Sequence, residues 1–159
     1  MSQGTQAGLT DWPDLAGRLA VDDDGRQSHR LAVRVYFEDT DFSGVVYHAA
    51  YLKFMERGRS DFLRCLKLSH AILSETGMAF GVSHMDIRFL AGAGIDDLLL
   101  VRTELAKCSG VRLVFDQTVL CGERVLVTAS VIVVLIKDGK PQRLPASMLT
   151  LFKALSKSS

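Results

Sequence analysis

One change of hydrophobic period constrains the fold of this chain more than any other feature of its sequence. Residues 31–37 alternate between apolar and polar side chains, which is the period of a half-buried β-strand. From about His48 the period lengthens to that of an amphipathic helix, whose apolar residues recur at spacings of four, three, four and four: Tyr51, Met55, Gly58, Phe62 and Leu66. The sequence therefore predicts one strand followed by one long helix that reaches about Lys67.

The rest of the chain is strand-like, apart from a short predicted helix at residues 70–75. Residues 85–89 alternate between apolar and polar side chains, and the run AGAG at residues 91–94 ends that strand. Glycine-containing links at residues 109–110 and 122–123 then separate three long strands, as in an antiparallel meander. One strand, one long helix and a meander predict an α+β fold in which a single antiparallel sheet packs on one major helix.

Gly58 lies on the apolar face of the predicted helix. A glycine inside a helix is less stable than alanine by about 1 kcal/mol, so its presence there needs a physical reason. We expect that reason to be close approach of the sheet at this point.

Residues 1–30 lack sustained periodicity and contain Gly4, Gly8, Pro13 and an acidic run at residues 22–24. We therefore expect a partly mobile N-terminal extension at residues 1–30 and one domain at residues 31–155. A chain of 159 residues is long enough for one such domain to bury its own core.

The charge and hydropathy of the chain exclude several classes of function. Nineteen basic against eighteen acidic side chains leave a net charge of +1, which gives no case for binding nucleic acid. No stretch approaches the ~20 apolar residues that cross a bilayer, and the N-terminal residues lack the features of a secretory signal. The three cysteines form no CxxC pair, which argues against a disulfide framework and a zinc site. We expect a cytoplasmic protein without a transmembrane segment.

The histidines and glycines carry no metal or phosphate motif. No two histidines have HxH or HExxH spacing, and neither a GxGxxG nor a GxxxxGK[ST] run is present. We therefore predict neither a metal nor a cofactor. His29, His70 and His84 are interpreted as ordinary surface or strand residues.

The conspicuous polar cluster is Glu38-Asp39-Thr40-Asp41, which is followed by His48 where the helical pattern begins. A helix N-terminus presents unpaired N–H groups and partial positive charge, which would stabilise the oxygen of a thioester under attack. A carboxylate on the preceding loop could attack the carbonyl carbon or activate a water. The residues alone favour a plainer interpretation, with Asp39 and Asp41 as turn or cap residues and His48 as a helix-start residue.

A resemblance reverses that preference. Residues 34–64 closely resemble the YbgC-type branch of the 4-hydroxybenzoyl-CoA thioesterase family; they read RVYFEDTDFSGVVYHAAYLKFMERGRSDFLR. Three later segments are similar to the same branch: FGVSHMDIRFLAGAGIDD, LVFDQ and RLPASM. The resemblance covers residues 31–153. One departure is the segment FLAGAG, where the branch commonly carries a proline.

The resemblance implies a hotdog fold, in which a long antiparallel sheet wraps around the central helix. It implies an acyl-CoA thioesterase with Asp41, in DFSGVVYH, as the catalytic carboxylate. The backbone N–H at His48 is expected to polarise the thioester carbonyl, and the His48 side chain is also implicated in catalysis. Gly44 is expected to permit the tight loop that brings Asp41 to the helix end. Tyr47 is expected at the substrate pocket, with a packing role as the alternative.

The resemblance also implies partners. Hotdog subunits pair edge to edge, with the active site between two chains, so a homodimer or homotetramer is expected. The expected substrate is an acyl-CoA, or the thioester of an acyl carrier protein. Several basic residues are candidates for binding the phosphates of CoA: Arg88, Arg102, Lys107, Arg112, Lys137, Lys140 and Arg143.

Two other functions stay open. A hydratase or dehydratase on the same fold would carry a DxNPxH-type signature, which this sequence lacks. The second is non-catalytic, because relatives in this branch are often encoded alongside the Tol–Pal envelope machinery. In that case the chain would bind an acyl thioester or acyl carrier protein as a partner linked to that system.

Overall fold

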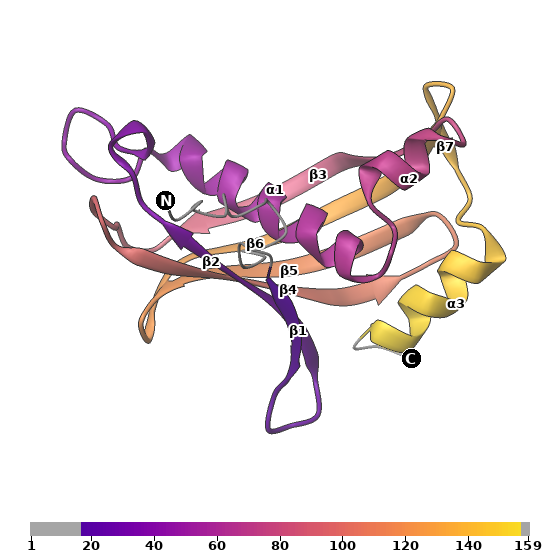
Figure 1. Cartoon of the computed structure of the whole chain (residues 1–159), viewed down its shortest axis with the longest axis horizontal. Helices are drawn as coiled ribbons and strands as arrows, with labels where there is room; N and C mark the ends of the chain where they lie inside the picture. Colours follow the sequence, from indigo (N-terminus) through magenta and orange to yellow (C-terminus); the bar gives the residue numbers. More distant parts are fainter. Residues whose placement is uncertain (1–16, 157–159) are drawn as a thin grey trace, which may run out of the picture.

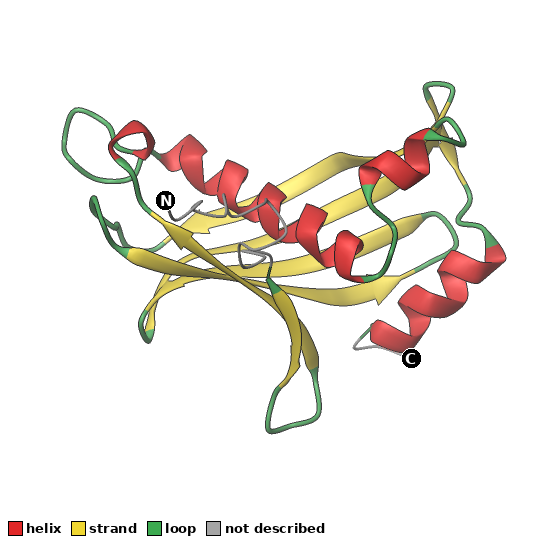
Figure 2. Cartoon of the chain, in the orientation of Figure 1, coloured by secondary structure: helices red, strands yellow, loops and turns green. Residues whose placement is uncertain are grey.

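The computed structural model describes residues 17–156, in which a sheet curves around one long helix (Figures 1 and 2). The helices are α1 (His48–Cys65), α2 (His70–Ser74) and α3 (Ala146–Leu155), and a short 3-10 helix, η2 (Phe37–Asp39), precedes α1. The strands are β1 (Arg18–Val21), β2 (Gln27–Arg34), β3 (Met78–Phe89), β4 (Leu98–Cys108), β5 (Arg112–Cys121), β6 (Arg124–Lys137) and β7 (Lys140–Gln142). None of the described helices is long and apolar enough to cross a membrane.

The described strands form one antiparallel sheet in the order β1-β2-β4-β5-β6-β3, and β7 also pairs with β6. β4, β5 and β6 make the predicted meander, in which Val119 lies opposite Val101 on one side and Val127 on the other. β3 pairs with β6, so β3 and β1 are the two edges of the sheet. The predicted α+β architecture, with one antiparallel sheet around a central helix, is confirmed.

The apolar face predicted for α1 packs on the inner face of the sheet. Tyr51, Met55 and Phe62 are at most 3% exposed, and Gly58 is buried beside them. The sheet contributes to the same core the inward-facing residues of β4, β5 and β6, among them Val101, Leu105, Phe115, Val119, Val131 and Leu135. Burial of this apolar surface holds α1 in place.

Gly58 lets α1 approach β4 and β5 closely. A Cβ atom on Gly58 would lie 2.9 Å from both Thr103 Oγ1 and Val101 Cγ1, and 3.3 Å from Gln117 Nε2. Carbon atoms in contact normally lie about 3.5–4.0 Å apart, so no side chain fits here without displacing its neighbours. The expected reason for a glycine on this face is confirmed.

The sheet begins earlier in the chain than the sequence predicts. β1 and β2 form a hairpin in which Arg18 lies opposite Arg30, and its turn ends at Gly25 with a positive φ of 80°. Asp22 forms ion pairs with Arg30 and Arg102, which fasten the hairpin to β4. The predicted strand start at residue 31 is therefore late, and the expected domain boundary falls inside β2. Residues 1–16 of the expected extension lie outside the described residues.

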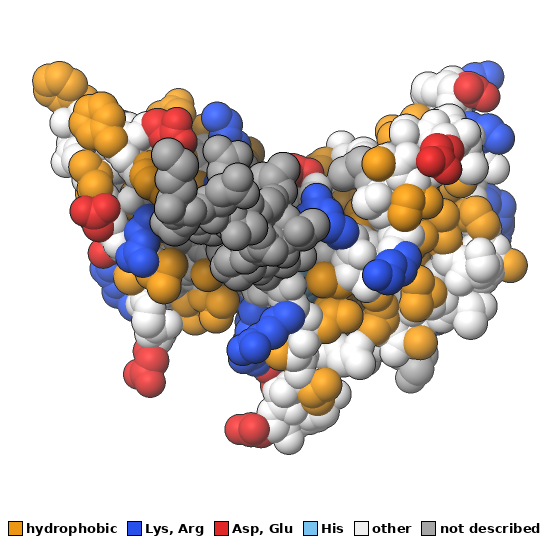
Figure 3. All heavy atoms as spheres, in the orientation of Figure 1, with side chains coloured by type: hydrophobic (Ala, Val, Ile, Leu, Met, Phe, Trp, Pro, Cys, Tyr) orange, Lys and Arg blue, Asp and Glu red, His pale blue; other side chains and the backbone are white. Residues whose placement is uncertain are grey.

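The strand also ends earlier than predicted. β2 stops at Arg34, and Phe37, which was expected on the buried face, is 81% exposed. Other large apolar side chains are exposed around the loop that precedes α1, and hydrophobic side chains gather at this end of the molecule (Figure 3). We call this surface the apolar rim, and its members are Tyr36, Phe37, Phe42, Val45, Tyr47, Phe89 and Leu90.

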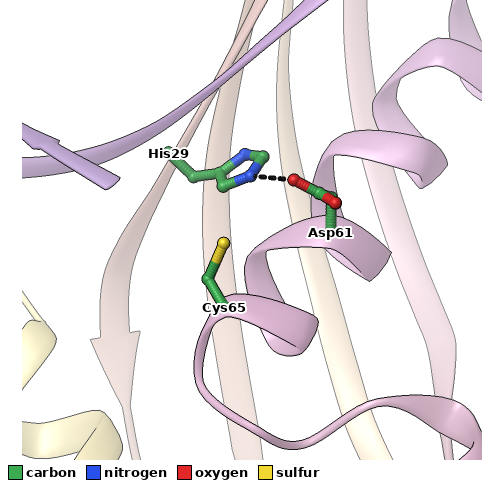
Figure 4. A group of neighbouring side chains, drawn as sticks. All are labelled: His29, Asp61 and Cys65. Carbon is green, nitrogen blue, oxygen red and sulfur yellow. Dashed lines mark hydrogen bonds and ion pairs between the residues drawn. The ribbon is translucent and has the colours of Figure 1, made fainter. Parts of the chain in front are cut away.

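His29 is a strand residue, as interpreted, but its side chain is fully buried and joins β2 to α1 (Figure 4). Its Nε2 atom lies 2.6 Å from Asp61 Oδ2. The Asp61 carboxylate also accepts hydrogen bonds from the Gly17 backbone N–H at 2.7 Å and from Arg64 Nη1 at 2.9 Å. No sequence pattern indicated the pair, because 32 residues separate its members.

The prediction of strands almost to the end of the chain is wrong for α3. Pro145 is the N-cap of this helix, and Met148, Leu149 and Phe152 follow at helical spacing. Phe152 is fully buried, and its ring lies 6.2 Å from the ring of Phe80. Pro145 followed by this short apolar repeat was the feature of the sequence that indicated a helix here.

We expect Gly58→Ala to lower the free energy of unfolding, although alanine favours a helix by about 1 kcal/mol. The new methyl group would overlap Thr103 and Val101, and overpacking of this kind typically destabilises by about 1–3 kcal/mol. Urea unfolding measures the change, with the exposed position Arg57→Ala as control. Adding Val101→Ala should recover part of the loss. An increase in stability on Gly58→Ala would contradict the close contact.

We expect the folded state to lose stability as the pH falls below the ordinary histidine pKa of 6.5. Burial lowers the pKa of His29, although Asp61 opposes the shift, so the unfolded chain takes up a proton that the folded chain resists. The free energy of unfolding should therefore be highest above that pH. His29→Gln should reduce the slope between neutral and acidic pH in urea titrations, whereas His84→Gln, at an exposed position, should not. An equal slope in both variants would refute the assignment.

Candidate active site

The loop between β2 and α1 is built on Asp39. Its Oδ2 atom accepts the backbone N–H of Tyr36 at 2.9 Å, and its own N–H donates to Tyr36 O at 3.0 Å. The carbonyl oxygen of Asp39 accepts the N–H of Tyr47 at 2.9 Å. Asp39 therefore holds both ends of the loop together, and the plainer interpretation of it as a turn or cap residue fits its contacts.

Asp41 lies at the start of a tight turn that closes on Gly44. The Gly44 N–H donates to Asp41 O at 3.0 Å, and the Asp41 N–H donates to Val45 O at 2.9 Å. Gly44 has a φ of +81°, a conformation that side chains other than glycine adopt with strain. The turn therefore depends on the conformational freedom of Gly44.

The turn is anchored to the segment after β3. Val46 N–H donates to Ala93 O at 2.9 Å, and Val45 forms a β-bridge with Gly94. Arg124 Nη2 donates to Gly92 O at 3.0 Å, which adds a cation beside this segment. Arg124 was absent from the basic candidates predicted for CoA phosphates, because only the fold brings the start of β6 next to the loop.

The Asp41 carboxylate is exposed and held by Ser43. Its Oδ1 atom accepts hydrogen bonds from the backbone N–H of Ser43, at 2.8 Å, and from the Ser43 hydroxyl. These two bonds, together with the nearby His48, lower the pKa of Asp41 below its usual value. A carboxyl group of this kind is ionised at neutral pH, so it is suited to act as a base or nucleophile rather than as an acid.

The N-terminus of α1 lies next in the chain and has no side-chain cap. Tyr47 is the N-cap residue, and its side chain makes no capping hydrogen bond. Within the described residues, the backbone N–H groups of His48 and Ala49 have no hydrogen-bond partner. These donors, with the partial positive charge of the helix end, form a site for a developing negative oxygen.

Aromatic rings surround the same helix end. The His48 ring is exposed and lies 4.4 Å from the ring of Tyr47 and 6.0 Å from that of Phe89, measured between centroids. Phe89 also contacts the ring of Tyr51 at 6.1 Å. The structure thus brings Asp41, Gly44, Tyr47 and His48 to one junction of loop and helix. The ring of Phe89 lies beside His48, and the sequence did not indicate this contact.

A second polar cluster, His29, Asp61 and Cys65, has atoms within 4.8 Å of one another and could hold a metal ion (Figure 4). Its hydrogen bonding does not fit that use. Nδ1 of His29 is buried without a partner. If a metal took Nε2, the proton would move to Nδ1 and leave a buried donor unpaired, which is unfavourable. The neutral ring that donates from Nε2 to Asp61 avoids this.

Comparison with known proteins gives the family of this chain. The family model of the thioesterase superfamily matches residues 43–132. The acyl-CoA thioester hydrolase YbgC of Escherichia coli is 40% identical over 127 residues, which cover 78% of this chain and 95% of that protein. The acyl-CoA thioesterase YbgC of Haemophilus influenzae is 42% identical over 109 residues, 68% of this chain and 80% of that protein.

A solved structure of a similar protein has the same fold. The crystal structure of a probable thioesterase from Bartonella henselae superposes with a TM-score of 0.72 at 48% identity, and covers 74% of this chain and 99% of that one. The described residues have the long antiparallel sheet and central helix of the hotdog fold. The chain therefore belongs to the thioesterase superfamily, in the family of the YbgC acyl-CoA thioesterases.

Proposed function

We propose that this protein hydrolyses acyl-CoA thioesters to a free acid and CoA, with Asp41 as the catalytic carboxylate. The supporting observation is the position of an ionised, exposed carboxylate beside the uncapped N-terminus of α1. One group supplies the base or nucleophile, and the other receives the charge that develops on the carbonyl oxygen. Family membership supports the same reaction class.

In the proposed reaction, the thioester carbonyl oxygen accepts hydrogen bonds from the backbone N–H groups of His48 and Ala49. Two routes are then open to Asp41. Its carboxylate oxygen can attack the carbonyl carbon, which expels the CoA thiolate and leaves an anhydride that water cleaves. Alternatively it takes a proton from water as the water oxygen attacks, and the thiolate leaves and is protonated. Both routes give one carboxylic acid and one thiol.

The neighbouring residues have separate proposed roles. Gly44 permits the turn that aims Asp41 at the helix end. The ring of His48, next to Asp41, positions the carboxylate, the water or the departing thiol. Tyr47 is 46% exposed, so it has the surface needed to line a substrate pocket. Arg124 joins the candidates for binding CoA phosphates, because it lies beside the loop.

We expect Asp41→Asn to lower kcat for acyl-CoA hydrolysis by about 10²- to 10⁴-fold, because an amide can neither attack nor take a proton. Asp39→Asn is the matched control. Its amide oxygen can still accept the Tyr36 N–H, so its rate should stay near that of the unaltered protein. Release of CoA thiol measures both rates, and circular dichroism checks folding. A folded Asp41→Asn protein with full activity would exclude this mechanism.

The proposal includes a homodimer or homotetramer. β3 is an edge strand, so one side of its backbone has no strand partner within the described residues. Exposed edges of this kind are usually covered in native proteins. Val82 on β3 is 50% exposed, and the apolar rim lies at the other end of the same strand. A second copy paired along β3 would cover these surfaces.

We expect light scattering to give the mass of a dimer or tetramer, and Val82→Lys to shift the protein toward monomer. A two-fold contact would place two such charges in one interface. The control is Val21→Lys, at the opposite edge of the sheet, where the valine is 63% exposed. A monomer at all concentrations, or equal effects of both lysines, would rule out pairing along β3.

A comparison of hydrolysis rates decides whether CoA or acyl carrier protein carries the acyl group. CoA and acyl carrier protein present the same thioester arm, so both should be offered to the enzyme. Affinity capture with Asp41→Ala tests the non-catalytic alternative, since a partner that binds independently of catalysis would remain attached. The predicted cytoplasmic location belongs to this proposal, because either substrate would be met there.

A further inference from the structure

Arg59 is a buried cation that forms no ion pair with a carboxylate of the described residues. Its side chain is on α1 and is only 8% exposed. Nη1 donates to Gln117 Oε1 at 2.7 Å, and no carboxylate within residues 17–156 lies in ion-pair distance of the guanidinium. Burial lowers the pKa of Arg59, although Glu56 opposes the shift. Buried charges are normally paired, so this arginine calls for a functional explanation.

Gln117 fixes the guanidinium in place but satisfies only part of it. Gln117 Nε2 donates to Met55 O and to Thr103 Oγ1, each at 2.8 Å, so its amide cannot rotate freely. An arginine carries five N–H donors, and Gln117 accepts one of them. The rest are available to a ligand that reaches Arg59.

A cavity of about 170 Å³ opens beside Arg59, between α1 and β3. Its apolar walls include Leu63, Phe80 and Val82. Its polar lining consists of Glu56, Arg59 and Ser60, and Glu56 accepts a hydrogen bond from the Ser60 hydroxyl at 2.5 Å. We call this the Arg59 cavity. It places a donor and an acceptor together in an otherwise apolar space.

The Arg59 cavity and the candidate active site both lie where β3 flanks α1. β3 flanks α1 at both places: Phe89 contacts the ring of His48, and Phe80 lines the cavity beside Arg59. Arg59 is eleven residues after His48 on α1. At ~1.5 Å per residue this is about 16 Å along the helix. A fully extended chain advances roughly 1.2 Å per bond, so an acyl chain of about twelve carbons matches this length.

We propose that the Arg59 cavity is the distal acyl subsite of this enzyme and selects chains that carry a hydroxyl group near their far end. Arg59 donates to the hydroxyl oxygen, and Glu56 accepts the hydroxyl hydrogen. A plain alkyl end would remove water from the guanidinium and return no hydrogen bond, which disfavours it. A chain that ends in a carboxylate would be repelled by the negative charge of Glu56. The inference rests on the proposed thioesterase activity.

The test compares kcat/KM for four substrates: butanoyl-CoA, dodecanoyl-CoA, 12-hydroxydodecanoyl-CoA and dodecanedioyl-CoA, whose acyl chain ends in a carboxylate. The unaltered protein should prefer the hydroxyl-ended chain over dodecanoyl-CoA by about 10- to 100-fold. Arg59→Met should abolish this preference, and it should lower kcat/KM more for the hydroxyl-ended chain than for butanoyl-CoA, which is too short to reach the cavity. The matched control is Arg57→Met, since Arg57 is an exposed arginine two residues earlier on the same helix.

Glu56→Gln is a second variant, at an exposed position that should tolerate the change. The neutral glutamine removes the repulsion between residue 56 and a carboxylate end. Hydrolysis of the carboxylate-ended chain should therefore rise at least several-fold relative to the hydroxyl-ended one. The inference is overturned if the unaltered protein lacks the hydroxyl preference, or if folded Arg59→Met retains it. Failure to hydrolyse any substrate, butanoyl-CoA included, would instead overturn the proposed function, and the subsite with it.

Discussion

The close packing of α1 on β4 and β5 at Gly58 sets the position of the helix whose N-terminus lies at the candidate site. The absence of a side chain at Gly58 allows the helix to rest on Val101 and Thr103, and apolar residues before and after it complete the core. A helix held at that depth has a fixed N-terminus, so the backbone donors of His48 and Ala49 also have fixed positions. The His29–Asp61 hydrogen bond fastens the other half of the helix to β2.

The loop before α1 carries the carboxylate that we propose as the catalytic group. Asp39 and Asp41 are two residues apart, yet their carboxylates make different contacts. Asp39 uses its carboxylate and backbone to close the loop, and Asp41 keeps its carboxylate on the surface under the influence of Ser43. The turn at Gly44 and the contacts of Val45 and Val46 with residues 93–94 hold this arrangement. A scaffold of backbone hydrogen bonds thus fixes the turn that carries the carboxylate.

Much of the fold could be predicted because its signals are local. The period of α1, the glycine-containing links of the meander and the glycine on the helix face all depend on neighbouring residues, and each is confirmed. The misses depend on distant partners. The β1–β2 hairpin gains its pairing from the chain fold and from the ion pairs of Asp22, and α3 gains its helix from burial of Phe152. Phe37 alternates correctly for a strand, but Asp39 closes a 3-10 turn there instead.

The sequence by itself determined the fold class, the family and the segment that carries Asp41 and His48, because these depend on periodicity and on one long contiguous motif. The tertiary structure alone decided which polar groups meet. It separated the structural Asp39 from the exposed Asp41, brought Arg124 beside their loop, and buried His29 against Asp61. It also buried Arg59 beside a cavity, with no described carboxylate within ion-pair distance. Such contacts join residues far apart in the chain, and a linear pattern contains no record of which distant groups the packing brings together.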